Sequence, residues 1–173
     1  MLRPRFLVLF PVVVLLACDR PPTTAPADPT QAVPPAASAL LSYRGVIESG
    51  APLDPDGLYL NVTEGPRIRL VGGETARLAR VVGAEVSLRG TLDAVDAMIV
   101  QTFLVIAVGG LPAADGVLVQ VGEDYGIRLL IDGSMRTLVN PPDELKVHVG
   151  ERVWITGPSD APPVGYGVIG GAT

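Results

Sequence analysis

Histidine and cysteine are almost absent from this chain, which has one of each in 173 residues. A single cysteine excludes an internal disulfide, and a single histidine excludes metal sites built from several histidines. Basic residues are also scarce relative to acidic ones: 13 lysines and arginines stand against 18 aspartates and glutamates, for a formal net charge of −5. Because nucleic acid demands a basic protein surface, this balance argues against a nucleic-acid partner.

The chain also lacks an apolar run of the roughly 20 residues that a membrane-spanning helix needs. The apolar stretch Phe6–Leu16 follows Arg3 and Arg5, and Asp19 and Arg20 end it after about half that length. A charged start, an apolar middle and small residues before a cut site are typical of a secretory signal peptide. The N-terminus is therefore predicted to direct export.

The four residues Leu15-Leu16-Ala17-Cys18 resemble the lipobox of bacterial lipoproteins. That resemblance implies that residues 1–17 are a lipoprotein signal peptide and that the Cys18 thiol carries acyl chains such as palmitate. Stable anchoring takes more than one acyl chain, which an acylated Cys18 would supply. We therefore expect a protein held on the periplasmic face of a bacterial membrane by its lipid.

The segment after the cysteine is rich in proline and has no apolar periodicity. Residues 21–39 read PPTTAPADPTQAVPPAASA. Such a composition is typical of an extended, partly polyproline II spacer. We interpret residues 18–41 as a lipidated tether, which separates the membrane from the folded part.

Beyond the tether the sequence repeats itself. Residues 83–90 match residues 150–157 at an offset of 67. Further matches occur in the same order, with offsets that drift from 71 to 67: Gly45-Val46-Ile47 with Gly116-Val117-Leu118, Gly57–Leu60 with Gly126–Leu129, Leu70-Val71 with Leu138-Val139, and Leu78 with Leu145. A period above 50 residues favours tandem domains over a solenoid. The predicted domains are 42–111 and 112–173.

Each copy contains short alternating apolar segments separated by glycine and proline, which predict strands and turns. The expected strands of the first copy are 44–48, 58–63, 67–71, 84–92 and 98–108, with a helical piece at 74–80. Those of the second copy are 116–121, 126–131, 135–139, 152–157 and 164–169, with a helical turn at 142–147.

This order, together with the pattern L-x-x-x-x-G-x-x-V-x-[LI]-x-G, resembles the OB-fold. The pattern runs from Leu78 to Gly90 and again from Leu145 to Gly157. The resemblance implies an all-β protein of two tandem five-stranded Greek-key barrels, each with a short helix between its third and fourth strands. It is similar to small exported bacterial OB-fold proteins of unknown function. A two-sheet β-sandwich is the alternative fold.

The segment Phe103–Val108 is apolar on both faces of its expected strand. A barrel strand buries only one face, so the other face needs a cover. We expect the second copy to supply it, which predicts packed barrels. The alternative is a modestly exposed apolar patch.

Two groups of residues are candidate binding sites. Tyr59, Arg67, Arg69 and Trp154 form a candidate ligand face, because they combine aromatic rings with cations. Trp154 alternates with apolar neighbours and should point away from its own barrel core, either into the other barrel or toward a ligand.

Acidic residues gather in the two loops that flank the usual ligand face of an OB-fold. Asp54 and Asp56 lie between the first and second strands, and Asp93 and Asp96 lie between the fourth and fifth. Calcium prefers six to eight oxygen ligands, so these four carboxylates are a candidate metal site. The alternative is that they are ordinary turn residues in solvent.

Catalytic patterns are missing from the sequence. No G-x-S-x-G motif occurs, and His148, which matches Val81 of the first copy, is interpreted as structural. We therefore expect no cofactor and a non-enzymatic binding or envelope-associated module, with an envelope protein or small ligand as partner. The alternative is a structural or assembly subunit of an envelope complex with 103–108 as its interface. An enzyme of unrecognised type is the third hypothesis.

Overall fold

A computed structural model describes residues 39–52, 54–94 and 97–171, and these residues form an all-β protein, as expected. The predicted signal peptide, Cys18 and most of the predicted tether lie outside the described residues. Within them, no helix is long and apolar enough to cross a membrane. The strands are β1 (Leu41–Ala51), β2 (Asp54–Val62), β3 (Arg67–Val71), β4 (Ala84–Ala94), β5 (Ala97–Val108), β6 (Leu111–Val121), β7 (Asp124–Leu129), β8 (Met135–Thr137), β9 (Glu151–Thr156) and β10 (Gly165–Gly171). The short helices are α1 (Thr75–Leu78), η1 (Ala79–Val81) and α2 (Asp143–Lys146).

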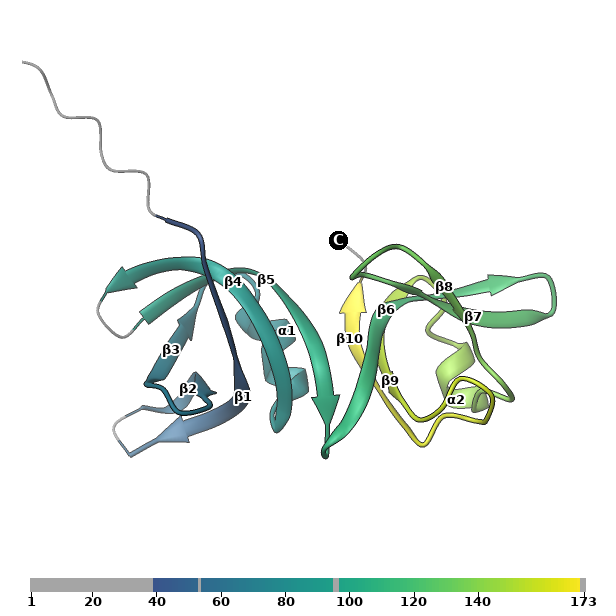
Figure 1. Ribbon diagram of the computed structural model, residues 1–173, viewed down its shortest axis with the longest axis horizontal. Coiled ribbons are helices and arrows are strands. Elements are labelled where there is room, and N and C mark those ends of the chain that lie inside the picture. The colour runs from purple at the N-terminus through teal and green to yellow at the C-terminus, as the bar shows by residue number, and fades with distance from the viewer. Residues whose placement is uncertain (1–38, 53, 95–96, 172–173) are drawn as a thin grey trace, which may run out of the picture. The chain divides into compact units, whose positions relative to one another are not determined.

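Strands β1 to β5, which we call the first half, close into a ring. The neighbours run β1-β2-β3-β5-β4 and back to β1. All pairs are antiparallel except β3 with β5, whose parallel pairing extends from Arg69 opposite Ala97 to Val71 opposite Ile99. Helices α1 and η1 connect β3 to β4 (Figure 1).

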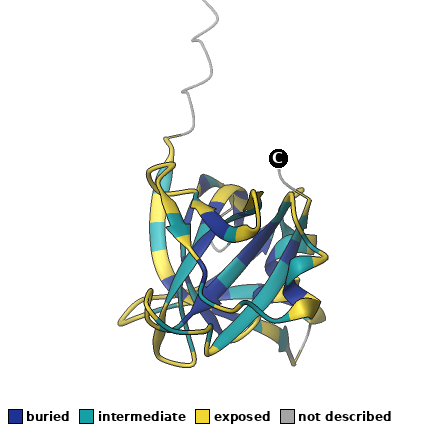
Figure 2. Ribbon diagram, turned by 90° about the vertical axis from the view of Figure 1, so that its right-hand side faces the viewer, coloured by how far each residue is buried: buried dark blue, intermediate teal, exposed yellow. Residues whose placement is uncertain are grey.

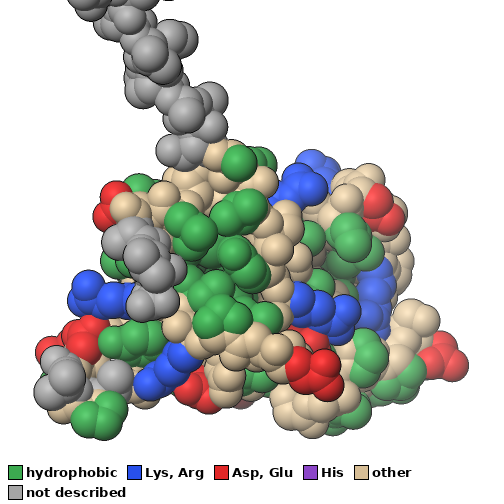
Figure 3. Space-filling model, turned by 60° about the vertical axis from the view of Figure 1, so that its left-hand side comes forward, with side chains coloured by type: hydrophobic (Ala, Val, Ile, Leu, Met, Phe, Trp, Pro, Cys, Tyr) green, Lys and Arg blue, Asp and Glu red, His purple; other side chains and the backbone are tan. Residues whose placement is uncertain are grey.

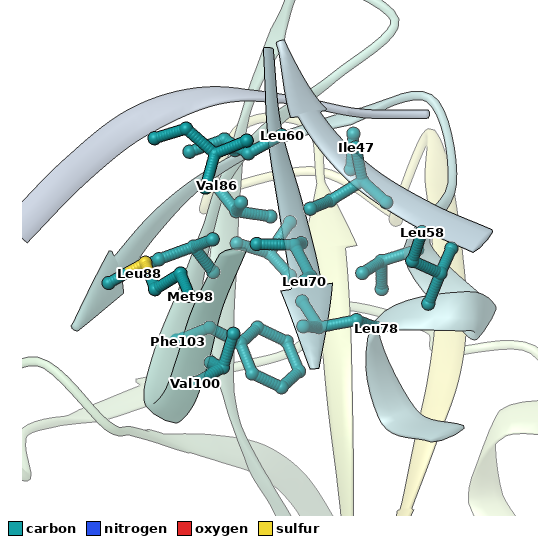
Figure 4. Close-up of a cluster of buried hydrophobic side chains, with 14 of the residues drawn as sticks. Ile47, Leu58, Leu60, Leu70, Leu78, Val86, Leu88, Met98, Val100 and Phe103 are labelled. Atoms are coloured by element: carbon teal, nitrogen blue, oxygen red, sulfur yellow. The ribbon is translucent and has the colours of Figure 1, made fainter. Parts of the chain in front are cut away.

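The ring is filled by the inward side chains of every one of its strands. Alternation places Leu58 and Leu60 inside and Tyr59 outside, as the sequence pattern predicts. Leu78 and Val81 of the helical segment are also buried in this core. The largest fully buried side chains of the first half are Ile47, Leu60, Leu78, Leu88, Met98 and Val86 (Figure 4).

Strands β6 to β10, the second half, have the same neighbour order but stay open. Strand β6 pairs with β7 and β9, β7 pairs with β8, and β9 pairs with β10. Among the described residues no pairing joins β8 to β10, which would correspond to β3 with β5. A separate core forms from Leu118, Ile127, Leu138, Leu145, Val153 and Ile155. In Figure 2 buried residues are interspersed with intermediate and exposed ones along the strands, and the loops are mostly exposed.

Corresponding residues of the halves make the same hydrogen bond. The amide of Gly83 donates to the carbonyl of Ile47, and the amide of Gly150 donates to the carbonyl of Leu118, both at 2.8 Å. These glycines have φ of +85° and +88°, in the left-handed region that favours glycine. The register of β4 and β9 therefore agrees with the offset of 67 residues.

The alignment of the second strands needs a correction. Ile47 lies opposite Leu60, and its counterpart Leu118 lies opposite Ile127. Leu60 therefore corresponds to Ile127, whereas the sequence match places Leu58 there. The glycine match is misleading because β2 is three residues longer than β7, and the inward side chains determine which residues pair.

The halves share one continuous hairpin and several packing contacts. Strands β5 and β6 are joined by Gly109 and Gly110, which have φ of +57° and +78°. Their pairing ends at Ala107 opposite Pro112, since proline lacks the amide proton that a longer ladder needs. Further along the chain, Ile169 of β10 is buried in the core of the first half.

Candidate functional site

Three of the predicted ligand-face residues lie together on the outer side of β2 and β3. The Tyr59 hydroxyl donates to Asp54 Oδ2 at 3.0 Å, and Arg69 Nε donates to the same oxygen at 2.9 Å. The guanidinium of Arg67 lies 4.1 Å from the centre of the Tyr59 ring and its Nε is 3.4 Å from Glu48 Oε2. Arg67 also donates to a backbone carbonyl at 2.6 Å.

This polar face is largely satisfied by its own side chains. Partial burial and the hydrogen bond to Asp54 raise the pKa of Tyr59, while the cations of Arg69 and Arg67 oppose the rise. Figure 3 shows acidic and basic side chains next to one another on the surface of the first half. A ligand on this face would therefore have to replace existing internal contacts, and the ligand-face hypothesis stays a prediction.

The expectation that the acidic residues lie in loops is wrong for Asp54 and Asp56, which belong to β2, and for Asp93, which belongs to β4. In the part of the chain that is described, no group of three or more His, Cys, Asp or Glu side chains lies close enough to hold a metal. Asp54 is bound by Tyr59 and Arg69, and Asp56 and Asp93 are exposed. Asp96 lies outside the described residues.

Trp154 packs between the halves. It lies opposite Asp115 on β6, as Ser87 lies opposite Arg44, which agrees with the predicted correspondence of Trp154 and Ser87. The indole contacts the core of the first half and covers Gly167 of β10, where a Cβ would meet its Nε1. Trp154 lies on β9, which pairs with β6 and β10 and not with β2 or β3, so the structure does not place it with the polar face.

A buried ion pair, which sequence reasoning missed, locks the halves together. Arg152 donates from Nε to Asp115 Oδ1 at 2.9 Å and from Nη2 to Oδ2 at 2.6 Å. Both residues are 6% exposed. Arg152 also donates to the carbonyl of Phe103 at 2.7 Å, and the amide of Val105 donates to Asp115 Oδ2 at 2.7 Å.

These contacts explain how the free edge of β5 is satisfied. Strand β3 reaches only as far as Ile99, so the edge beyond it has no strand neighbour there. The carbonyl of Phe103 and the amide of Val105 instead bond to the side chains of Arg152 and Asp115. Buried backbone groups need such partners. The sequence holds a clue, because the predicted repeat offsets of 71 and 67 put Asp115 and Arg152 at the positions of Arg44 and Glu85, another pair of opposite charges.

A cleft of about 550 Å³ opens between the halves beside this ion pair. Ser87 and Arg89 of β4 line it together with residues 101–104 of β5. Arg77 and Glu74 line it near α1, and Leu130, Ile131 and Arg152 line it from the second half. Its size falls in the range of small-molecule sites.

The polar groups of the cleft differ in how far they are engaged. Arg77 bonds to Glu74 at 3.2 Å and to the carbonyl of Gly171, and Arg152 is held by Asp115. Arg89 has no ion pair or side-chain hydrogen bond within the described residues. Of the four charged side chains that line the cleft, Arg89 is thus the one without such a bond to another described residue.

A smaller apolar recess adjoins the cleft. It has a volume of about 180 Å³ and shares Leu104 and Ile131 with the cleft. Ile106, Ala113, Ala114 and Leu129 line the rest of it, with Val105 and Asp115. Residues of the second half thus lie beside the outer face of 103–108, but Leu104 and Ile106 stay half-buried, so the expected cover is only partial.

His148 sits before β9 and is half-buried, with Nδ1 3.3 Å from Glu151 Oε1. Its counterpart Val81 is buried in the core of the first half. This position is consistent with the structural interpretation of His148.

Comparisons with known proteins found no family model, no curated protein and no solved structure that matches this chain.

Proposed function

We propose that this chain is an exported lipoprotein, anchored through acyl chains on Cys18, that binds a small ligand without catalysing a reaction. The observation that carries the binding role is the cleft of about 550 Å³, whose walls come from both halves. Because Asp115 and Arg152 hold the halves together, the walls are preformed. Preformed concave sites bind small molecules with little ordering cost.

We infer that 42–111 and 112–173 are duplicated OB-like barrels, the second of which is not closed. The ring order β1-β2-β3-β5-β4, the helix between β3 and β4, and the shared hydrogen bonds of Gly83 and Gly150 support this inference.

The lipid anchor is tested separately from the binding role. Metabolic labelling with a palmitate analogue should label the wild-type chain in the membrane fraction, and Cys18→Ala should abolish the label. Labelling of the Cys18→Ala variant would contradict the assignment of Cys18.

Binding is tested on the full chain carrying Cys18→Ala, which removes lipid attachment and changes no described residue. Its melting temperature is measured with calcium and with a panel of cell-wall sugars, peptides and small organic acids. A ligand at about 100 times its dissociation constant stabilises the fold by roughly 2.7 kcal/mol, which raises the melting temperature by several degrees. No shift with any compound, together with stable co-purification of one membrane protein, would favour the envelope-assembly hypothesis.

A further inference from the structure

The cleft and the recess adjoin, since Leu104 and Ile131 line both, and together they offer a charged end and an apolar end. Arg89 on β4 faces the cleft beside Thr102, its cross-strand neighbour on β5. Arg89 pairs with Thr102, but the next residue, Gly90, pairs with Val100. Gln101 therefore has no partner on β4 and forms a β-bulge. Bulges re-aim side chains at strand edges, and Gln101 lines the cleft.

Two exposed apolar side chains on a tight turn line the cleft, and Ile131 also lines the recess. Leu130 and Ile131 are 44% and 71% exposed, although both are large and aliphatic. The amide of Leu130 donates to the carbonyl of Asp115, and the amide of Gly133 donates to the carbonyl of Leu129, both at 2.9 Å. The turn is therefore anchored, and its Leu130 and Ile131 line the same cleft as the polar side chains of β4 and β5.

We propose that this surface binds an aliphatic carboxylate, meaning an anion that carries a short apolar chain. The carboxylate pairs with Arg89, whose fork of N–H donors suits two carboxylate oxygens, and Gln101 and Thr102 supply further hydrogen-bond donors. The alkyl chain of the ligand enters the recess along Leu104 and Ile131. An apolar cavity of about 150 Å³ is large enough to hold benzene, so the recess of about 180 Å³ has room for a short alkyl chain.

The buried ion pair makes this arrangement compatible with an anion. Asp115 borders the recess, but both of its oxygens already accept hydrogen bonds from Arg152 and from the amide of Val105. It therefore offers no free negative charge that would repel the ligand. This proposal rests on the proposed binding function and specifies its ligand class.

Isothermal titration calorimetry on the full chain with Cys18→Ala tests the proposal, with octanoate as the probe. Octanoate should bind, acetate should not, and 1-octanol should bind at least about tenfold more weakly, because it lacks the charge that pairs with Arg89. Shortening the alkyl chain of the ligand should weaken binding roughly fourfold for each methylene removed from the recess. An aliphatic carboxylate could be a free fatty acid or the C-terminus of a peptide, and leucyl-leucine distinguishes the two. Binding of leucyl-leucine that is tighter than that of octanoate would indicate a peptide C-terminus.

Matched variants locate the site. Arg89→Gln should weaken octanoate binding about tenfold, whereas Arg80→Gln, at an exposed arginine outside the cleft, should not change it. Ile131→Ser should weaken it several-fold, whereas Val147→Ser, at a valine that is 77% exposed elsewhere, should not. These four side chains are exposed or half-exposed, so all four variants should fold.

Two results would overturn the inference. Octanoate that binds equally well to Arg89→Gln and Arg80→Gln does not use the cleft. If octanoate does not bind while another compound of the panel raises the melting temperature, the proposed binding function stands and the ligand class is wrong.

Discussion

Both halves of the folded part carry an ion pair at the same place in the strand register, with the charges exchanged. Arg44 on β1 bonds to Glu85 on β4 at 2.7 Å, and Asp115 on β6 bonds to Arg152 on β9 at 2.6 Å. The side chains of Arg44 and Glu85 are 62% and 31% exposed, whereas those of Asp115 and Arg152 are 3% and 7% exposed. The two pairs therefore occupy the same position in the strand register. The pair that packs against β5 is part of the core, and the pair that does not is a surface feature.

The exchange of charges suits what the buried pair must do. An acid on β6 accepts from the amide of Val105, and an arginine on β9 donates to the carbonyl of Phe103 while its guanidinium lies 4.1 Å from the Phe103 ring. The exposed pair has no such strand edge to satisfy. Burial thus turns an ordinary cross-strand pair into the link that holds the cleft walls together.

Removing one partner from each pair should break this comparison most strongly. Asp115→Ala leaves a buried guanidinium without its counter-charge and should lower the free energy of unfolding by about 3–5 kcal/mol. Glu85→Ala, at the corresponding exposed pair, should cost under about 1 kcal/mol. Urea denaturation followed by circular dichroism measures both. Equal losses for the two variants would show that burial does not govern the difference.

The turns at Gly83 and Gly150 should lose similar stability when the glycine is replaced, in contrast to the two ion pairs. Gly83 and Gly150 have φ near +85° and +88°, and a methyl group added at either position would meet nothing within 4 Å. Gly83→Ala and Gly150→Ala should therefore each cost roughly 1–2 kcal/mol from backbone conformation alone. Gly73→Ala, which has similar space and no positive φ, is the control. A difference above about 1 kcal/mol between the two variants would contradict the equivalence of the turns.

The open second half should gain stability when a charge is removed. Arg136 lies opposite Ile127, as Ile68 of the closed ring lies opposite Leu60. Its Nη2 donates to the carbonyl of Gly157, but its buried Nε has no partner within the described residues. Arg136→Met should raise the free energy of unfolding by about 1 kcal/mol, because the unpaired donor is lost and the stem is kept. A loss of stability would mean that the bond to Gly157 outweighs the unpaired donor.

Local patterns predicted most of the fold. Strand β3 was expected at 67–71 and spans Arg67–Val71, and the helical pieces expected at 74–80 and 142–147 contain most of α1 and η1 and all of α2. Alternation and glycine-marked turns are local signals, which a sequence displays directly. The double-sided apolar segment 103–108 indicated that another part of the chain would pack against β5, and residues of the second half lie beside it.

The cleft could not be predicted in the same way. Its walls depend on where the ladder between β5 and β6 stops at Pro112, and on a bulge that turns Gln101. Arg89 and Ile131 lie far apart in the sequence, and only the packing of the halves brings both to one cleft. The polar face of Tyr59 was easier to find, because pairing of β2 with β3 places Arg69 opposite Tyr59.

The smallest expected effect is the change in the pKa of Tyr59 on the polar face of β2 and β3. The pKa of Tyr59 is raised, so its contribution to stability is present below the tyrosine pKa of the unfolded chain and is lost as the pH rises through the higher folded value. Asp54→Asn should lower the pKa of Tyr59, since the hydrogen bond to the carboxylate is one of the causes of the rise and Arg67 and Arg69 remain to oppose it. Nuclear magnetic resonance titration of the tyrosine rings measures the pKa. Asp56→Asn, which alters an exposed neighbouring carboxylate, should leave it unchanged, and an equal fall in both variants would show that the direct hydrogen bond is not the cause.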